Sequence, residues 1–327
     1  MTRLAKLLVP MLLAGAGACA PSVKVLRTKP AEINLAGLNQ LAIVEVTGSD
    51  GHQLGNDLTE AIFKTNRFKL VERSALDKIV REQRMSNASG LFAEGAKVGE
   101  LLPASGLVAG QASHRVRDEV SRKNTTCTTE VNKKKVQVPC VEYTRDASVT
   151  YDASLKLLDT RTGRLLATRA FHKIGKDKSW ATDEEPAAID TGALLIGCRQ
   201  EVVGEFVRMI APFQVQEEVV LAVDDALPTL AAGNGLAKHG EWEAAVEQYG
   251  MAVAKAGATP GLEPKSRGKA HYSLGLGLVM MGRYDDGLAE LRKAVTLHGD
   301  DDWAAFMQRA KAWKADAEKL QKQTAGL

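Results

Sequence analysis

The feature that most constrains the fold is an internal repeat in the last third of the chain. Two stretches match one another at a constant offset of 42 residues. A repeat at one fixed offset indicates a structural unit that stacks on its own copy. It predicts an all-α C-terminal domain of stacked repeats over residues 226–327, and an ordinary pair of helical hairpins that is not a repeat is the alternative. The matched pairs are Gly233 and Gly275, Gly240 and Gly282, Trp242 and Tyr284, Ala245 and Gly287, and Ala252 and Ala294.

Within each unit, a small residue is followed seven positions later by glycine and then by an aromatic residue, a spacing that resembles the tetratricopeptide repeat. Repeats of that family are about 34 residues long, so about eight extra residues lie between the units, and we place them in residues 257–264. Residues 302–323 are expected to be the capping helix. The resemblance implies a concave groove that binds a protein partner. The side chains expected to face that partner are Leu230, Asn234, Lys269, Tyr272, Leu276 and Val279.

The N-terminal residues 1–18 have the pattern of an export signal. Arg3 and Lys6 give a positively charged start, residues 7–13 form an apolar run, and residues 14–18 are all small. Signal peptides have these three parts in this order. We therefore expect the chain to leave the cytoplasm.

The segment Ala16-Gly17-Ala18-Cys19 resembles a bacterial lipobox, in which the thiol of Cys19 is joined to diacylglycerol. Cleavage of the same bond in an ordinary secreted protein is the alternative. The resemblance implies lipidation at Cys19 and, because Ala20 is not an aspartate, the periplasmic face of the outer membrane. A lipid with several acyl chains anchors a protein firmly. Residues 19–37 are expected to be a tether between the lipid and the folded chain.

Export places the cysteines in an oxidising compartment, where disulfides persist. The sequence between Cys127 and Cys140 predicts a hairpin that turns at Lys133-Lys134, a register in which the two cysteines face one another. We therefore expect a Cys127–Cys140 disulfide. A metal site is the alternative, but two cysteines without a nearby histidine supply too few ligands. Cys198 lies in an apolar run and is expected to be a buried thiol.

Residues 38–213 alternate between strand and helix patterns, which predicts an α/β domain of the α+β sandwich type. A long amphipathic helix is expected over residues 186–210. A polar hairpin is expected as an insertion at residues 114–146, and a linker is expected at residues 214–225. The predicted strands are residues 41–46, 68–73, 106–110, 148–158 and 164–171.

The order LAIVEV, FKLVERSALDKIVREQ, SGLVAGQ and LKLLDTRTGRLL, over roughly residues 38–212, resembles the curli-secretion channel (CsgG) family of outer-membrane lipoproteins. The resemblance implies a lipid-anchored periplasmic α/β domain. The same fold also resembles lipoproteins that activate peptidoglycan synthases. The curli channel crosses the membrane by hairpins at two places, which match residues 114–146 and 172–185 here. Because both stretches are rich in charged residues, we expect no pore.

No group of residues in the sequence indicates catalysis. The six histidines lack the spacing of metal ligands, and the formal net charge of +3 gives little attraction for nucleic acid. We therefore expect no enzyme and no cofactor, but a membrane-anchored scaffold or secretion accessory that binds other proteins and self-associates. A curli-type channel subunit and a regulator of a peptidoglycan synthase are the alternatives.

Overall fold

The computed structural model describes residues 21–71, 105–160 and 162–325. The predicted signal peptide and Cys19 lie outside these residues. The chain divides into two compact units. One unit contains Thr28–Phe213 and Ala317–Leu327, and is called the α/β unit below. The other contains Met1–Arg27 and Gln214–Asp316, and is called the helical unit.

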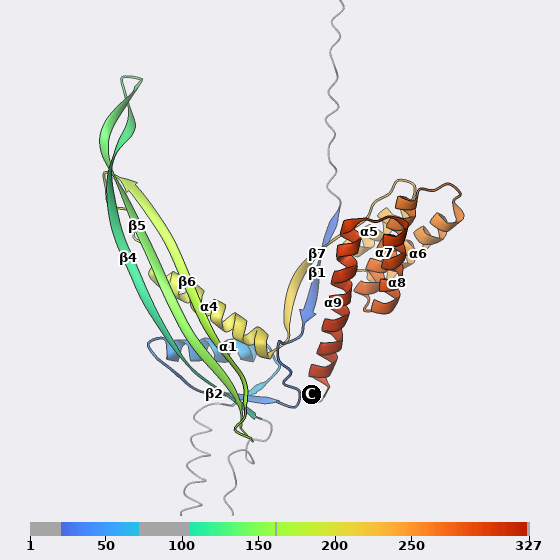
Figure 1. The fold of residues 1–327 in the computed structure, drawn as a ribbon, viewed down its shortest axis with the longest axis horizontal. Helices are drawn as coiled ribbons and strands as arrows, with labels where there is room; N and C mark the ends of the chain where they lie inside the picture. The colour runs from blue at the N-terminus through green and yellow to red at the C-terminus, as the bar shows by residue number, and fades with distance from the viewer. Residues whose placement is uncertain (1–20, 72–104, 161, 326–327) are drawn as a thin grey trace, which may run out of the picture. The chain divides into compact units, whose positions relative to one another are not determined.

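The described part of the α/β unit contains a five-stranded mixed sheet. β2 pairs in parallel with both β3 and β4, whereas β4, β5 and β6 are antiparallel to one another. Two helices, α1 (Gly51–Lys64) and α4 (Thr191–Ile210), lie on the concave side of the curved β4–β6 sheet (Figure 1). In sheet order the strands are β3 (Lys69–Leu70), β2 (Gln40–Thr47), β4 (Ser105–Val131), β5 (Lys134–Asp159) and β6 (Leu165–Thr182).

The core of this unit follows from two sequence periods. In β5, alternate residues face the helices and are buried, as the period of two in a strand requires. In α1, residues three or four apart are buried, as the period of 3.6 in a helix requires. The mixed α/β sandwich expected from the sequence is confirmed. The buried residues of this core include Leu54, Leu58, Ile62, Tyr151, Leu155, Leu157, Val202 and Phe206.

The predicted insertion at residues 114–146 is not separate from the sheet. β4 and β5 run through it without interruption, from the pair Gly106–Asp159 to the pair Val131–Lys134. β6 accompanies them as far as Thr182, which is opposite Glu142. We call the distal part of these three strands the arm. It consists of residues 114–131 of β4, 134–151 of β5 and 173–182 of β6. Its end, residues 124–141, is a two-stranded hairpin.

The sequence predicts that this hairpin turns at Lys133-Lys134, but in the structure the turn lies one residue earlier. Asn132 and Lys133 both have positive φ, 51° and 61°, as a two-residue turn of type I′ requires. This turn shifts the register by two positions, so Cys127 is opposite Val138 rather than Cys140. The disulfide between Cys127 and Cys140 is nevertheless formed, with Cα atoms 5.8 Å apart.

The predicted tether and the predicted linker each contain a strand, and both expectations are corrected. β1 (Ser22–Lys29) and β7 (Phe213–Val220) form a two-stranded sheet. Leu221 N–H also donates to Pro21 O at 2.7 Å. Apolar residues alternate with polar ones in both segments, so one face of the pair can be buried. Val25 and Val219 are buried in the core of the helical unit, which a solvated tether would leave exposed.

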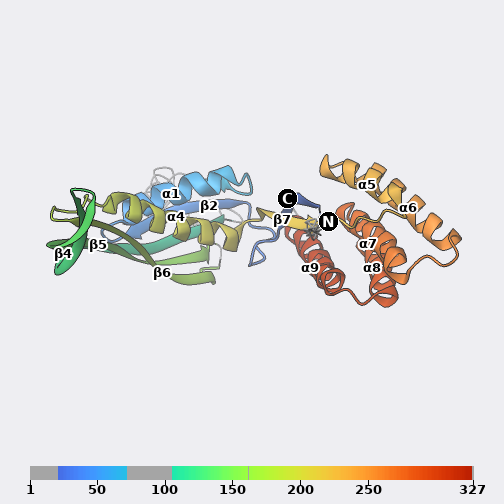
Figure 2. The same cartoon turned by 90° about the horizontal axis from the view of Figure 1, so that it is seen from above.

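The helical unit contains two helical hairpins, which lie side by side (Figure 2), followed by a longer helix. The repeat is visible in the turns, where Gly240 N–H donates to Ala237 O and Gly282 N–H donates to Val279 O, both at 3.0 Å. Both glycines have positive φ, 82° and 76°, which favours glycine at this position. The helices are α5 (Pro228–Lys238), α6 (Trp242–Ala258), α7 (Pro264–Met280), α8 (Tyr284–Leu297) and α9 (Asp301–Thr324), of which α9 belongs to this unit as far as Asp316.

Candidate functional site

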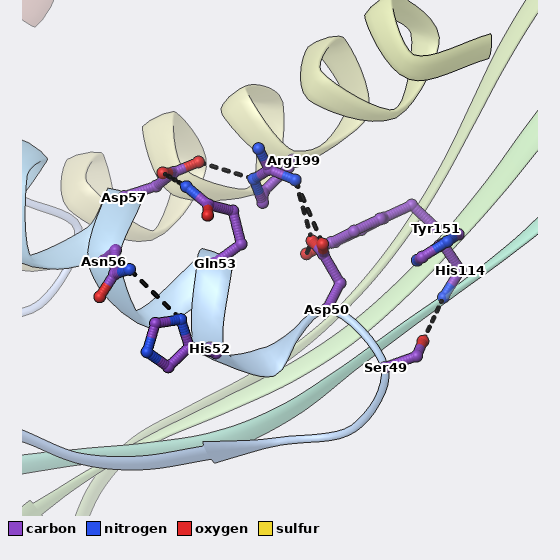
Figure 3. A network of polar contacts seen from close by, with 9 residues as sticks. All are labelled: Ser49, Asp50, His52, Gln53, Asn56, Asp57, His114, Tyr151 and Arg199. Atoms are coloured by element: carbon purple, nitrogen blue, oxygen red, sulfur yellow. Dashed lines mark hydrogen bonds and ion pairs between the residues drawn. The ribbon is translucent and has the colours of Figure 1, made fainter.

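A buried network of polar side chains lies between α1, α4 and β5 (Figure 3). Arg199 Nε donates to Asp57 Oδ2 at 2.6 Å, and Arg199 Nη1 donates to both carboxylate oxygens of Asp50 at 3.2 Å. Tyr151 Oη donates to Asp50 Oδ2 at 2.8 Å. Asp50 and Arg199 are only 8% and 7% exposed. The network therefore joins the start of α1 to the middle of α4 and to the sheet.

The surroundings of Arg199 and Tyr151 in this network raise the pKa of both groups. Burial opposes the charge of Arg199, but the hydrogen bonds to Asp57 and Asp50 outweigh it and raise the pKa of the guanidinium. Burial and the hydrogen bond to Asp50 raise the pKa of Tyr151 well above its usual range. Through these hydrogen bonds the network ties both helices to the sheet.

The described residues contain no candidate metal site. Across residues 21–71, 105–160 and 162–325, no group of three or more His, Cys, Asp or Glu could hold a metal ion. His172 is paired with Asp152, and His271 with Glu290, in the two closest histidine contacts. No helix in these parts of the chain has both the length and the apolar character needed to cross a bilayer.

The six side chains predicted to bind a partner contact the chain itself. Tyr272, Leu276 and Val279 form a buried cluster with Val219 and Leu221, which follow the α/β unit in the sequence. Leu230 belongs to a second cluster, between α5 and α6. Asn234 is 4% exposed and Lys269 is paired with Asp224. The expectation of an open face is therefore corrected, because five of these side chains are buried within the helical unit and Lys269 is paired there.

Residues 218–224 are the end of β7 and the four residues that follow it. Side chains from three different helices donate hydrogen bonds to every second carbonyl of this segment. The bonds join Arg309 Nη1 to Glu218 O (3.1 Å), Tyr272 Oη to Val220 O (2.9 Å) and Asn234 Nδ2 to Ala222 O (2.9 Å). We call the surface formed by these donors the groove. Asn234 is itself held by Tyr249, whose Oη donates to Asn234 Oδ1 at 2.9 Å.

The far end of the segment is held by charge. Asp224 Oδ2 accepts hydrogen bonds from Lys269 Nζ at 3.0 Å and from Ser266 Oγ at 2.8 Å. Burial opposes ionisation of this carboxyl group, but these hydrogen bonds outweigh burial and lower its pKa. Asp224 is therefore a fixed negative charge at the end of the groove.

Residues 218–224 were not predicted to be part of a site. One signal could have found them, because Phe213, Val215, Val219 and Leu221 keep one parity along the chain. Such alternation indicates a strand rather than a linker. The interruption at Glu217, which pairs with Arg27 at 3.1 Å, weakens that signal.

The arm of the α/β unit presents two open strand edges. β2 pairs with β4 only as far as Gln111, so on the side of β4 away from β5 no described strand lies beside Arg115 to Val131. β6 is the last strand of the sheet, and no described strand lies beyond it. Both faces of the arm carry ion pairs. Arg145 binds Asp118 through two hydrogen bonds, at 2.8 and 2.9 Å, whereas Arg117 and Glu119 are paired on the opposite face.

Comparison with known proteins identifies part of the chain. Residues 43–184 match the family model of the curli production assembly/transport component CsgG. This part of the chain is therefore similar to that family. No curated protein matches the chain.

Two solved structures are similar to part of the chain at low identity. The PelC dodecamer from Paraburkholderia phytofirmans is 15% identical, with a TM-score of 0.22, and the match covers 56% of this chain and 97% of that one. The lipoprotein GNA1162 from Neisseria meningitidis is 12% identical, with a TM-score of 0.25, and the match covers 52% of this chain and 98% of that one.

Proposed function

We propose that this protein is a non-enzymatic, lipid-anchored accessory of the bacterial envelope, which acts in assembly or export at the periplasmic face of the outer membrane. The match of residues 43–184 to a curli production assembly/transport component supports the role in assembly or export. The signal-peptide pattern before Cys19 supports the compartment. For the helical unit we propose two tetratricopeptide-like repeats, supported by the offset of 42 residues and by the matching turns.

The observation that carries this proposal is the pair of open edges on the arm. An edge strand presents unpaired N–H and C=O groups, which readily pair with a strand from another chain. In sheet order, β4 and β6 lie on opposite sides of β5, so their free edges point away from one another. We propose that the β4 edge of one copy pairs with the β6 edge of the next. Such a head-to-tail contact builds an assembly from identical chains.

A curli-type channel subunit is the second candidate, and the length of the strands favours it. β4 has 27 residues and β5 has 26. However, the ion pairs on both faces of the arm argue against contact with lipid, because a charge is costly to remove from water. If the arm spanned a bilayer, lipid would displace water from the Asp118–Arg145 pair on one face or from the Arg117–Glu119 pair on the other. A scaffold in the periplasm therefore fits the arm better.

Photo-crosslinking in intact cells tests the edge pairing. A photoreactive amino acid is placed at Arg115 on β4, at Lys176 on β6, or at Lys311 on α9 as a control. We expect crosslinked chain dimers from the first two positions, with β4 joined to β6 by mass spectrometry, and none from the control. Crosslinks only to other proteins, or none at all, would contradict self-association through the arm. Stable ion conductance of liposomes that contain the protein would instead favour the channel.

A further inference from the structure

The groove of the helical unit holds residues 218–224 in the way that a binding site holds a peptide. On the groove side, the backbone of the segment is bonded by side chains of α5, α7 and α9 rather than by another strand. Main-chain hydrogen bonds of this kind give affinity for any extended segment, and side-chain pockets then give specificity. Both elements of peptide recognition are therefore present in one surface.

Three side chains of the segment meet specific surroundings. Val219 and Leu221 occupy alternate positions and are buried against Tyr272 and its neighbours. Asp224 is bound by Lys269 and Ser266. The intervening Val220 and Val223 are 40% and 47% exposed, so their positions place little demand on the side chain. The groove thus selects an apolar residue, a second apolar residue two positions later, and a carboxylate three positions after that.

We infer that this groove is a peptide-binding site, and that residues 218–224 occupy it as an internal ligand. Its partner class is an extended segment of another protein with the same three features. Such a partner binds only when it displaces residues 218–224, so the groove is closed in the protein by itself. The inference concerns the helical unit alone and does not depend on edge pairing of the arm.

Binding of a synthetic peptide to the full chain tests this inference. The probe is a fluorescein-labelled peptide of residues 216–226, QEEVVLAVDDA, and its anisotropy is measured as protein is added. The apparent affinity falls with the fraction of molecules in which the groove is open. We therefore expect weak binding to the wild-type chain. The double variant Leu221→Ala/Asp224→Ala weakens the internal ligand and leaves the groove unchanged, so we expect it to bind the peptide at least about tenfold more tightly.

Reversing the charges of the Lys269–Asp224 pair distinguishes specific binding in the groove from non-specific binding of the peptide to the protein surface. A chain with Lys269→Glu should prefer a peptide that carries lysine in place of Asp224 over the wild-type peptide, because the ion pair is restored with its signs reversed. Arg283→Glu makes the same change of charge at an exposed position outside the groove. This control variant should keep the preference of the wild-type chain.

Circular dichroism establishes first that each variant is folded. If the double variant does not fold, Asp224→Asn alone removes the charge at the end of the segment and keeps both apolar contacts. It should still bind the peptide more tightly than the wild-type chain does. The inference is overturned if no folded variant binds the peptide more tightly, or if Lys269→Glu shows no preference between the two peptides. Residues 218–224 would then be a permanent part of the core.

Discussion

Arg199 is the residue that holds the polar interior of the α/β unit together. Its guanidinium lies between Asp50 at the start of α1 and Asp57 about two turns later. Removing one partner of a buried ion pair leaves the other charge without compensation, which costs far more than the loss of an exposed pair. Two carboxylates and the hydroxyl of Tyr151 depend on this one side chain, directly or through Asp50.

We therefore expect Arg199→Leu to lower the free energy of unfolding by about 3–5 kcal/mol. Gln200→Leu, at an exposed position on the same helix, should change it by no more than about 0.5 kcal/mol. Denaturant unfolding followed by circular dichroism measures both. Equal effects of the two substitutions would show that the network contributes no particular stability.

At the scale of elements, the helical hairpins depend on close crossings at glycine. A Cβ atom added at Gly233 would lie 2.5 Å from the ring of Tyr249, and one added at Gly275 would lie 2.8 Å from Leu291 Cγ. Tyr249 cannot move easily, because it is fully buried and its hydroxyl is bonded to Asn234. The two glycines are thus required by packing, and they occupy the same position in the two hairpins.

Gly233→Ala should destabilise the chain by about 1–3 kcal/mol, because the added methyl group overpacks the crossing. Gly235→Ala is a matched control on the same helix, since no atom lies within 4 Å of its added Cβ. Alanine is favoured over glycine in a helix interior by about 1 kcal/mol, so this control should stabilise the chain. Thermal unfolding measures the two shifts, which are expected to have opposite signs. A stabilising effect at Gly233 would mean that the hairpins are less tightly packed than described.

Local periodicity allowed much of the fold to be predicted, but not the pairings between distant segments. The alternation from Val149 to Leu157 correctly indicated a strand with one buried face. Ser22 and Glu218, whose side chains are bonded, lie 196 residues apart, and neither short segment shows by itself what it pairs with. The hairpin register was wrong because Asn132 accepts a positive φ, which moves the turn by one residue.

The candidate site was predictable only in part for a similar reason. The repeat pattern predicts six partner-binding side chains on α5 and α7, and most of these side chains contact residues 218–224. Helical periodicity shows which face is apolar, but it does not show whether that face is covered by the same chain or by a partner. Asn234 and Lys269 are bonded to Ala222 and Asp224, contacts that no pattern within either helix contains.

For the whole molecule, the position of β1 changes how a lipid anchor would act. β1 begins at Ser22, and Pro21 is already bonded to Leu221, so little free chain separates the predicted anchor at Cys19 from the helical unit. Consecutive Cα atoms are about 3.8 Å apart, which limits the span from Cys19 to Ser22 to about 11 Å. A lipid on Cys19 would therefore hold the helical unit close to the bilayer, without the long tether expected from the sequence.

The intact mass of the protein extracted from cell membranes tests the central claim, export and lipid attachment, most directly. The account predicts a chain that begins at Cys19 and carries the added mass of a diacylglyceryl group and an amide-linked acyl chain. A Cys19→Ala variant should be absent from the membrane pellet and present in the soluble periplasm. A free thiol on Cys19, or a chain that still carries residues 1–18, would contradict the account.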